Sequence, residues 1–189
     1  KADPARPGSA WCADGHLQRM APPLIAAAAF GLAYRPMTDA DLPFVEALFP
    51  STRAEEFALT GLAPEQLQAL LAQQHKAQHH HYRLHHCAAE WLIVEREGEP
   101  IGRLYLDRSG ESDRVIDISL VAEARGQGIG GAILADVIAD AEDRQRAVSI
   151  HVEMRNPARR LYERLGFAIV GEAGLYLRME RLARGGTTV

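Results

Sequence analysis

The stretch that decides the fold is Arg125-Gly126-Gln127-Gly128-Ile129-Gly130-Gly131. A strand pattern precedes it at Val115–Val121 (VIDISLV), and a helical pattern follows it from Gly128 to Arg144. Glycines let the backbone turn sharply and approach a ligand closely. The helix that begins here offers free N–H groups and a partial positive charge, to which Arg125 adds a forked cation. The stretch therefore predicts a site for a phosphate or pyrophosphate.

Two alternatives exist for these glycines. They could simply tighten the turn between strand and helix, or they could form the GxGxxG fingerprint of a dinucleotide fold through Gly126, Gly128 and Gly131, with Glu153 ending the next strand. In that fold the first glycine follows its strand almost directly, whereas here Ala122–Arg125 intervenes. The alternating order of strands and helices expected of such a fold is also missing. The phosphate site is therefore favoured outside a dinucleotide fold.

On both sides of the glycine stretch, sequence patterns typical of strands and helices cover most of the chain. Val115–Val121 is apolar on both faces, which is typical of a strand buried on both sides. Glu97–Pro100 predicts a compact hairpin connection. The order predicts a mixed α/β protein. The expected strands are Leu32–Met37, Glu90–Arg96, Ile101–Asp107, Val115–Val121, Val148–Glu153, Phe167–Val170 and Leu175–Met179, and the expected helices run from Thr38 or Asp39 to Phe49, from Ala63 to about His81, from Gly128 to Arg144 and from Asn156 to Leu165.

Length and composition indicate one globular domain. The chain has 189 residues, of which 47% are hydrophobic and 24% charged, and this suits a single core. We expect residues 31–183 to form the domain and 184–189 to form a tail. Residues 1–30 are expected to be a linker, a cloning remnant or a disordered extension. Within them Pro22–Phe30 imitates the apolar core of a signal peptide, although the chain retains it.

Charge and cysteine content indicate which partners and which cellular compartment to expect. The net charge of −4 gives no general attraction to nucleic acid or to an anionic membrane, and it is too small to indicate a cationic substrate. No apolar run reaches the roughly 18–20 residues needed to span a bilayer. Cys12 and Cys87 are far apart and could form one disulfide. We favour two free thiols in a reducing compartment, and hence a cytoplasmic protein.

Two motifs resemble the GCN5-related N-acetyltransferase (GNAT) superfamily. Arg125–Gly130 resembles its Arg/Gln-x-x-Gly-x-Gly/Ala signature, and Asn156 with Tyr162–Phe167 resembles its Asn…Tyr-x-x-x-Gly-Phe segment. The likeness is strong over Val115–Phe167 and loose over Leu32–Asp107, and Ala122 departs from it where many members carry proline. It implies the GNAT-like acyl-CoA N-acyltransferase fold. That fold is a twisted, mostly antiparallel mixed sheet of about six or seven strands flanked by about four helices, with the fourth and fifth strands splayed apart.

The resemblance implies direct transfer of the acetyl group of acetyl-CoA to a primary amine in a ternary complex, without a metal. The pyrophosphate would lie on the amides of Arg125–Gly130, and the backbone of Leu120 and Val121 would pair with the pantetheine arm. Tyr162 would donate a proton to the leaving thiolate, although it could also simply pack on the sheet. Asn156 could bind the pantetheine, cap its helix, or do both. The implied donor-binding residues are Leu120, Val121, Arg125, Gly126, Gln127, Gly128, Ile129, Gly130, Asn156 and Tyr162.

The sequence leaves the general base open. Asp117 stands in an otherwise apolar strand, where an unpaired carboxylate is costly. It is therefore equally a candidate catalytic base and a structural acceptor for Arg103. His151 and Glu153 share one face of their strand and are weaker candidates. An amine that is already partly neutral would need no dedicated base.

A histidine cluster follows the second expected helix. Two pairs in it have the i, i+4 spacing that can share a metal, but no cysteine or carboxylate completes a compelling ligand set. A solvated polar face is favoured, and some of these imidazoles could instead contact a substrate. The cluster consists of His75, His79, His80, His81, His85 and His86.

The acceptor amine is not identified by the sequence. We expect a small molecule, with a protein amine as the alternative, and the resemblance allows a homodimer. Two other functions remain open: a non-catalytic acyl-CoA-binding regulatory module and, less favoured, a dinucleotide-binding oxidoreductase. The presence of Tyr162 and Asn156 beside Arg125 favours the enzyme, because a binding module would have less need of that set.

Overall fold

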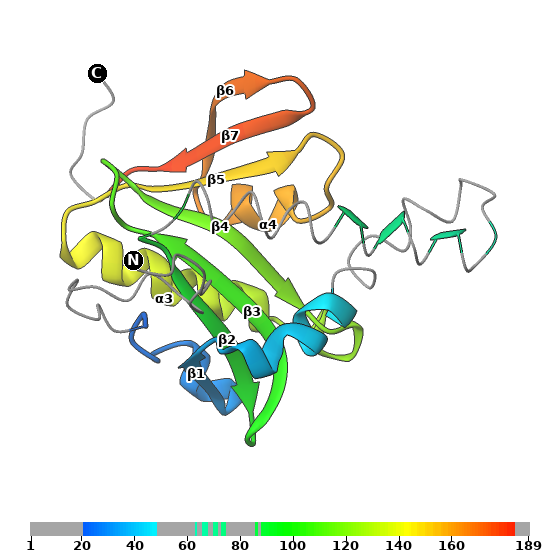
Figure 1. Cartoon of the computed structure of the whole chain (residues 1–189). Coiled ribbons are helices and arrows are strands. Elements are labelled where there is room, and N and C mark those ends of the chain that lie inside the picture. The colour runs from blue at the N-terminus through cyan, green and yellow to red at the C-terminus, as the bar shows by residue number, and fades with distance from the viewer. Residues whose placement is uncertain are drawn as a thin grey trace, which may run out of the picture.

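The computed structural model describes residues 21–48, 63, 66–67, 70–71, 73–74, 86 and 88–183. Seven strands form one sheet in the order β1-β2-β3-β4-β5-β7-β6, in which only β4 and β5 are parallel neighbours (Figure 1). The predicted mixed α/β fold with a mostly antiparallel sheet is confirmed. The strands are β1 Leu32–Pro36, β2 Glu90–Arg96, β3 Glu99–Asp107, β4 Asp113–Leu120, β5 Val148–Glu153, β6 Ala168–Ala173 and β7 Tyr176–Arg181.

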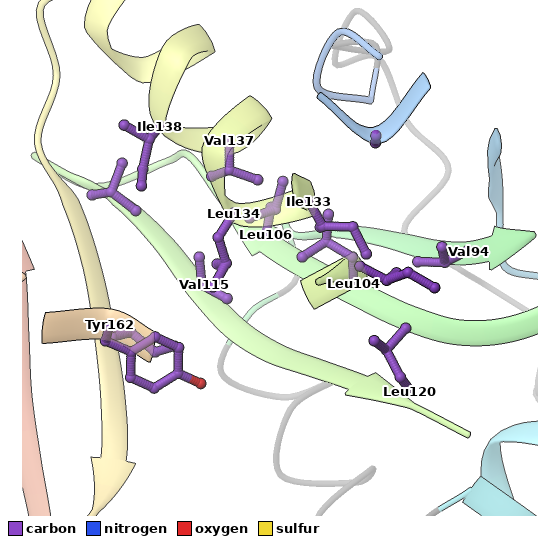
Figure 2. Packing of buried hydrophobic residues seen from close by; sticks show 14 of the residues in the cluster. Val94, Leu104, Leu106, Val115, Leu120, Ile133, Leu134, Val137, Ile138 and Tyr162 are labelled. Carbon is purple, nitrogen blue, oxygen red and sulfur yellow. The ribbon is translucent and has the colours of Figure 1, made fainter. Parts of the chain in front are cut away.

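Helices cover both faces of the sheet. Helix α3 (Ile129–Asp143) packs on one face, and Figure 2 shows its apolar stripe meeting β3 and β4. The helical residues 42–48 lie on the opposite face, where Val45 packs with Ile93 and Tyr105. The short helix α4 (Arg159–Arg164) follows β5. Residues 66–67, 70–71 and 73–74 are also helical, while the rest of the helix predicted from Ala63 to about His81 lies outside the described residues. The described part of the chain contains three 3-10 turns as well. These turns are η1 Ala27–Phe30, η2 Asp39–Asp41 and η3 Ala122–Ala124.

The central strands β4 and β5 pair over only three positions. The last paired residues are Val115 and Ile150, although β4 continues to Leu120 and β5 to Glu153. A bulge at Ile116 sits where the pairing stops, because β3 pairs with Val115 and then with Asp117. Bulges bend a strand and raise its twist. The two strands therefore splay into a fork, as expected, which is closed at Val115 and open toward the ends of both strands.

Two local expectations need correction. The β2–β3 connection is the two-residue turn Glu97-Gly98 rather than the four-residue Glu97–Pro100, because φ is positive at both residues and such a turn matches the strand twist. Strand β4 is also not buried on both faces throughout. The residues from Ile116 to Ser119 are partly exposed, because β5 has separated from β4 at this level.

The segment before β1 packs against α3. The carboxylate of Asp136, a helix residue that is 1% exposed, accepts the N–H groups of Ile25, Ala26 and Ala27 at 2.7–3.1 Å. The side chain of Ala27 is fully buried in the core between α3 and the sheet. Residues 21–30, expected to precede the domain, are thus bound to it through a long-range contact that the local sequence does not reveal.

A buried charge network joins the C-terminal half of α3 to the strands. Asp113 is 1% exposed and accepts hydrogen bonds from Arg144 and Arg146, while Arg108 pairs with Asp140. Glu90 lies 3.2 Å from the Nε of Arg108. Burial raises the pKa of Glu90 to about 7, and the nearby Arg108 guanidinium only partly opposes this. Among the described residues its second carboxylate oxygen has no hydrogen-bond partner.

Removal of the Asp136 carboxylate should destabilise the fold. In Asp136→Ala three backbone N–H groups lose their acceptor, and we expect the free energy of unfolding in urea to fall by about 2–3 kcal/mol or more. Asp143→Ala is the matched control, since this exposed carboxylate lies on the same helix and its loss should change stability by no more than about 0.5 kcal/mol. Equal stability of the two variants would contradict the role of Asp136.

Glu90 should make stability depend on pH. Because its pKa is raised in the folded protein, the folded state keeps a proton that the unfolded state releases. Stability should therefore fall as the pH rises from the ordinary glutamate range through about 7. Glu90→Gln should lose less stability than the wild type between pH 5 and pH 8 in urea denaturation. Parallel pH profiles for the two proteins would show that Glu90 does not carry this proton.

Candidate functional site

The glycine stretch forms a loop between η3 and α3 that leaves the helix N-terminus uncapped. Gly126 and Gly128 have φ values of 73° and 86°, in the left-handed region that favours glycine. Gly128 is the cap residue of α3 and provides no side-chain hydrogen bond. The first N–H groups of a helix have no intrahelical partner, so those at Ile129 and Gly130 are placed to bind an anion. A Cβ on Gly126 would meet nothing within 4 Å, which leaves space beside the loop.

Two polar side chains tie this loop to the sheet. The Nε of Arg125 donates to the carbonyl of Leu120 at 2.8 Å, which holds the loop to the end of β4. Gln127 donates to the carbonyl of Glu123 at 2.5 Å and accepts a hydrogen bond from Arg96 at 3.3 Å. The predicted residues Arg125 and Gln127 therefore shape the loop as well as line it.

The backbone of β4 offers unpaired groups toward the fork. The N–H of Val121 donates to the carbonyl of Ile101 at 2.9 Å, so Val121 is turned toward β3. Successive strand residues direct their N–H and C=O groups to opposite sides, so those of Leu120 and Ile118 face the fork. The carbonyl of Leu120 is already bound by Arg125, which leaves the N–H of Leu120 and both backbone groups of Ile118 for a ligand. Of the two predicted backbone positions, the structure brings Leu120 to the fork, and it adds Ile118. This could not be predicted without the register between β3 and β4.

Tyr162 lies beside the fork on α4. It is 5% exposed, and its ring meets that of Phe167 edge-on with centroids 6.0 Å apart. Figure 2 shows its hydroxyl pointing away from α4 toward β4. Burial raises the pKa of Tyr162 to about 12, and the charge of Asp117 contributes. The phenol is therefore protonated near neutral pH. Its ring packs in the core and its hydroxyl is directed toward β4, while the role of proton donor stays a prediction.

Asn156 acts as a local cap in front of α4. Its Oδ1 accepts the N–H of Ala158 at 2.8 Å, and α4 begins at Arg159 rather than at Asn156. Asn156 also lines a hollow together with Arg155, Arg159 and Arg160. This cationic hollow follows the end of β5. It therefore lies toward the open end of the fork, where the N-terminus of α3 is also found.

We call the sheet face opposite α3 the distal face. On β4, β5 and β7 it carries the residues that alternate with core positions, and Tyr105 of β3 lies on it under the helical residues 42–48. Along the fork and beside its closed end this face carries several titratable and charged groups. They are Arg103, Asp107, Arg114, Asp117, His151, Glu153 and Arg178.

Asp117 is held by several hydrogen bonds on this face. Arg103 donates to its two oxygens at 2.8 and 3.3 Å, and the hydroxyl of Ser119 donates to it at 2.7 Å. The guanidinium of Arg103, 3% exposed, also stacks over the ring of Tyr105 at 5.2 Å. Both oxygens of the Asp117 carboxylate are thus already occupied by hydrogen-bond donors. The structure therefore favours the structural alternative for Asp117 over the catalytic one.

His151 occupies the first position of β5 beyond its pairing with β4. The residue is exposed and lies across from Arg178 of β7. Partial desolvation, followed by the charges of Arg114, Arg178 and His86, lowers the pKa of His151. Its imidazole is therefore neutral at pH 7 and can accept a proton. Glu153, on the same face, accepts a hydrogen bond from the hydroxyl of Tyr176 at 3.3 Å.

Most of the histidine cluster lies outside the described residues, as do both cysteines. Its described member, His86, contacts Asp107 through Nδ1 at 2.8 Å. Among the helices that the structure describes, none has the length and apolar character needed to cross a membrane.

Comparison with known proteins agrees with this geometry. A family model described as an acetyltransferase (GNAT) domain matches residues 87–169, which include β2 to β5, the glycine loop, α3 and α4. No curated protein matches the sequence.

Solved acetyltransferase structures share the fold at low identity. PaiA N-acetyltransferase from Thermoplasma acidophilum in complex with coenzyme A superposes with a TM-score of 0.62 at 15% identity, covering 80% of this chain and 98% of that one. A histone acetyltransferase HPA2 and related acetyltransferase from Corynebacterium glutamicum gives 0.59 at 21% identity, covering 84% and 99%. Spermidine N-acetyltransferase from Vibrio cholerae in complex with CoA and spermine gives 0.56 at 21% identity, covering 82% and 96%.

Proposed function

Because this chain belongs to the GNAT acetyltransferases through its domain at residues 87–169, we propose that it transfers the acetyl group of acetyl-CoA directly to a primary amine. One observation carries the proposal: β4 and β5 separate after Val115 and Ile150. The resulting fork has an uncapped helix N-terminus at its open end and the hydroxyl of Tyr162 beside it. Such a fork can hold an extended thioester along β4.

The donor would lie along the unpaired side of β4. Both backbone groups of Ile118 and the N–H of Leu120 would pair with the amides of the pantetheine arm, which takes the place of a neighbouring strand. The N–H groups of Ile129 and Gly130 would hold the pyrophosphate at the start of α3. The cationic hollow at Asn156 suits a further anionic part of the donor. Acetyl-CoA, when bound, supplies the activated acetyl group.

The chemistry needs two proton transfers. The amine nitrogen bonds to the thioester carbon, the carbon–sulfur bond breaks, the amine loses one proton and the thiolate gains one. We assign the second proton to the hydroxyl of Tyr162, which is still protonated near pH 7. We assign the first to His151, since it is neutral and exposed at the closed end of the fork. Asp117 stays paired with Arg103 and acts on Tyr162 through its charge.

Acetyl-CoA binding should depend on the backbone of the glycine loop. Gly126→Ala forces a side chain onto a left-handed φ of 73°, and we expect calorimetry to show at least about tenfold weaker binding of acetyl-CoA. Gly98→Ala is the matched control: Gly98 has a φ of 83°, open space around it and a position in the β2–β3 turn. Both variants should lose similar stability, but the control should bind acetyl-CoA normally.

Two outcomes would contradict the proposed function. Binding of NADH without binding of acetyl-CoA would restore the dinucleotide alternative. Binding of acetyl-CoA with no release of CoA in the presence of any amine would favour the non-catalytic module.

The pH profile of turnover should identify the two proton-transfer groups. The acid limb of kcat/KM should lie below pH 6.5, because the pKa of His151 is lowered, and the rate should rise with pH as this imidazole loses its proton. His151→Gln should lose that limb. Tyr162→Phe should keep the limb and the affinity for acetyl-CoA, but its kcat should fall by about 10²-fold. An unchanged acid limb in His151→Gln would exclude His151 as the base.

A further inference from the structure

Arg114 is a cation on the distal face that lacks a counter-ion in the part of the chain the structure describes. Arg114 is partly buried and lies on β4, one residue before the last position that pairs with β5. Its Nε is buried and has no hydrogen-bond partner. Burial of an unpaired charged group is costly, so such a group usually has a partner. A ligand that carries negative charge would provide one.

The carboxylates around Arg114 all have other partners. Asp107 is its cross-strand neighbour on β3, but one oxygen of Asp107 contacts His86 at 2.8 Å. The other oxygen accepts the N–H and the hydroxyl of Ser109 at 3.0 and 2.5 Å. These hydrogen bonds outweigh the effect of burial and lower the pKa of Asp107. The Asp107 carboxylate therefore lies opposite Arg114 in the sheet but is hydrogen-bonded to His86 and Ser109 instead.

The remaining carboxylates of the distal face follow the same rule. Asp117 is bound by Arg103 and Ser119, and Glu153 accepts a hydrogen bond from Tyr176. Glu180 of β7 lies two strands from Arg114 in the same cross-strand row and pairs with Arg178 at 3.3 Å. An anion that approaches Arg114 from solvent would therefore meet a guanidinium that these carboxylates do not neutralise.

A second arginine adds to the positive charge. Arg178 stands directly across from His151 and pairs with Glu180 of its own strand at 3.3 Å. Its side chain is 51% exposed, so this pair is weak and solvent-screened. Arg114 lies across from Ser149, two residues before His151 on β5, so the register places Arg114, Arg178 and His151 in one part of the face. The charges of both arginines contribute to the lowered pKa of His151.

We propose that Arg114, assisted by Arg178, binds an anionic group of the acceptor, so that the acceptor is an amine that carries its own carboxylate or a similar oxyanion. Guanidinium groups bind carboxylates and phosphonates through two parallel hydrogen bonds. An amino acid fits this description, whereas a polyamine or a simple alkylamine does not. The inference rests on the proposed function and specifies its substrate class.

The spacing along β4 suits a small bifunctional molecule. From Arg114 to Asp117 the strand advances by about two regular steps, because Ile116 is the extra residue of the bulge, and this corresponds to roughly 7 Å. The anion would lie in the closed part of the sheet and the amine at the fork, beside His151. A few bonds between the two groups span this separation.

The local charge also favours the reaction of such an acceptor. When the anion of the acceptor binds Arg114, it offsets the charge that lowers the pKa of His151. The imidazole then becomes a stronger base in the complex than in the free protein. The acid limb of kcat should accordingly lie at higher pH than that of kcat/KM.

Matched acceptor pairs test the inference. The wild type is assayed at pH 8 for CoA release with α- and ω-amino acids, with the primary amides of the same amino acids, with 2-aminoethylphosphonate and with spermidine. We expect kcat/KM for the better amino acids to exceed that of their amides at least tenfold. In Arg114→Gln this ratio should approach one, and Arg114→Lys should recover part of it. Arg164→Gln, an exposed arginine at the end of α4, is the control and should keep the wild-type ratio.

The outcomes separate this inference from the proposed function. Calorimetry with acetyl-CoA is run on every variant and should give the same affinity throughout. Three results, each with normal binding of acetyl-CoA, would overturn the acceptor class alone. These results are equal turnover of amino acids and their amides, a preference for spermidine, and no turnover of any anionic amine. Failure of the wild type to bind acetyl-CoA would overturn the proposed function, and the acceptor class with it.

Discussion

The short pairing of β4 with β5 is the constraint on which the rest of the site depends. Hydrogen bonding between the two strands stops after Val115 and Ile150, and the bulge at Ile116 turns β4 away. Backbone groups in the middle of a sheet are normally paired, and unpaired ones are costly when they are buried. The fork therefore leaves a row of donors and acceptors on β4 that an extended ligand can satisfy. It also fixes where that ligand must end, because the paired part of the sheet closes the fork.

The remaining features follow from the direction of the two strands. Since β4 and β5 run parallel, their ends lie together at the open end of the fork, and so do the loops that follow them. The glycine loop and the N-terminus of α3 come after β4, and the hollow lined by Asn156 comes after β5. In the proposed mode of donor binding, the charged parts of the ligand would be held at the open end, and its reactive part would lie near Tyr162 and His151. The unpaired part of β4 would thus separate the reacting groups from the groups that bind the charged parts of the ligand.

Local sequence signals predicted the elements well, but they could not predict their mutual arrangement. Strands β2 and β5 have the predicted bounds, because their apolar periodicity and flanking turns are local. The connection between β2 and β3 is shorter than predicted, because Glu97 adopts a positive φ. A positive φ is not expected of a glutamate, so the sequence does not predict this turn. Whether Val121 or Ile118 faces the fork depends on the register with β3, and the exposure of His151 to Arg178 depends on β7. The contact of residues 25–27 with Asp136 spans more than a hundred positions.

The acceptor side illustrates why net charge is a poor guide to a site. The whole chain has a charge of −4, yet the distal face near the fork presents Arg114 and Arg178 around His151. The difference arises from pairing: the carboxylates of this face are bound by Arg103, His86, Ser109 and Tyr176, so their negative charge is locally offset. At roughly 8 Å of screening in physiological salt, distant surface carboxylates contribute little at this point. A substrate therefore meets the local pattern of paired and unpaired charges, and this pattern is set by the sheet register rather than by composition.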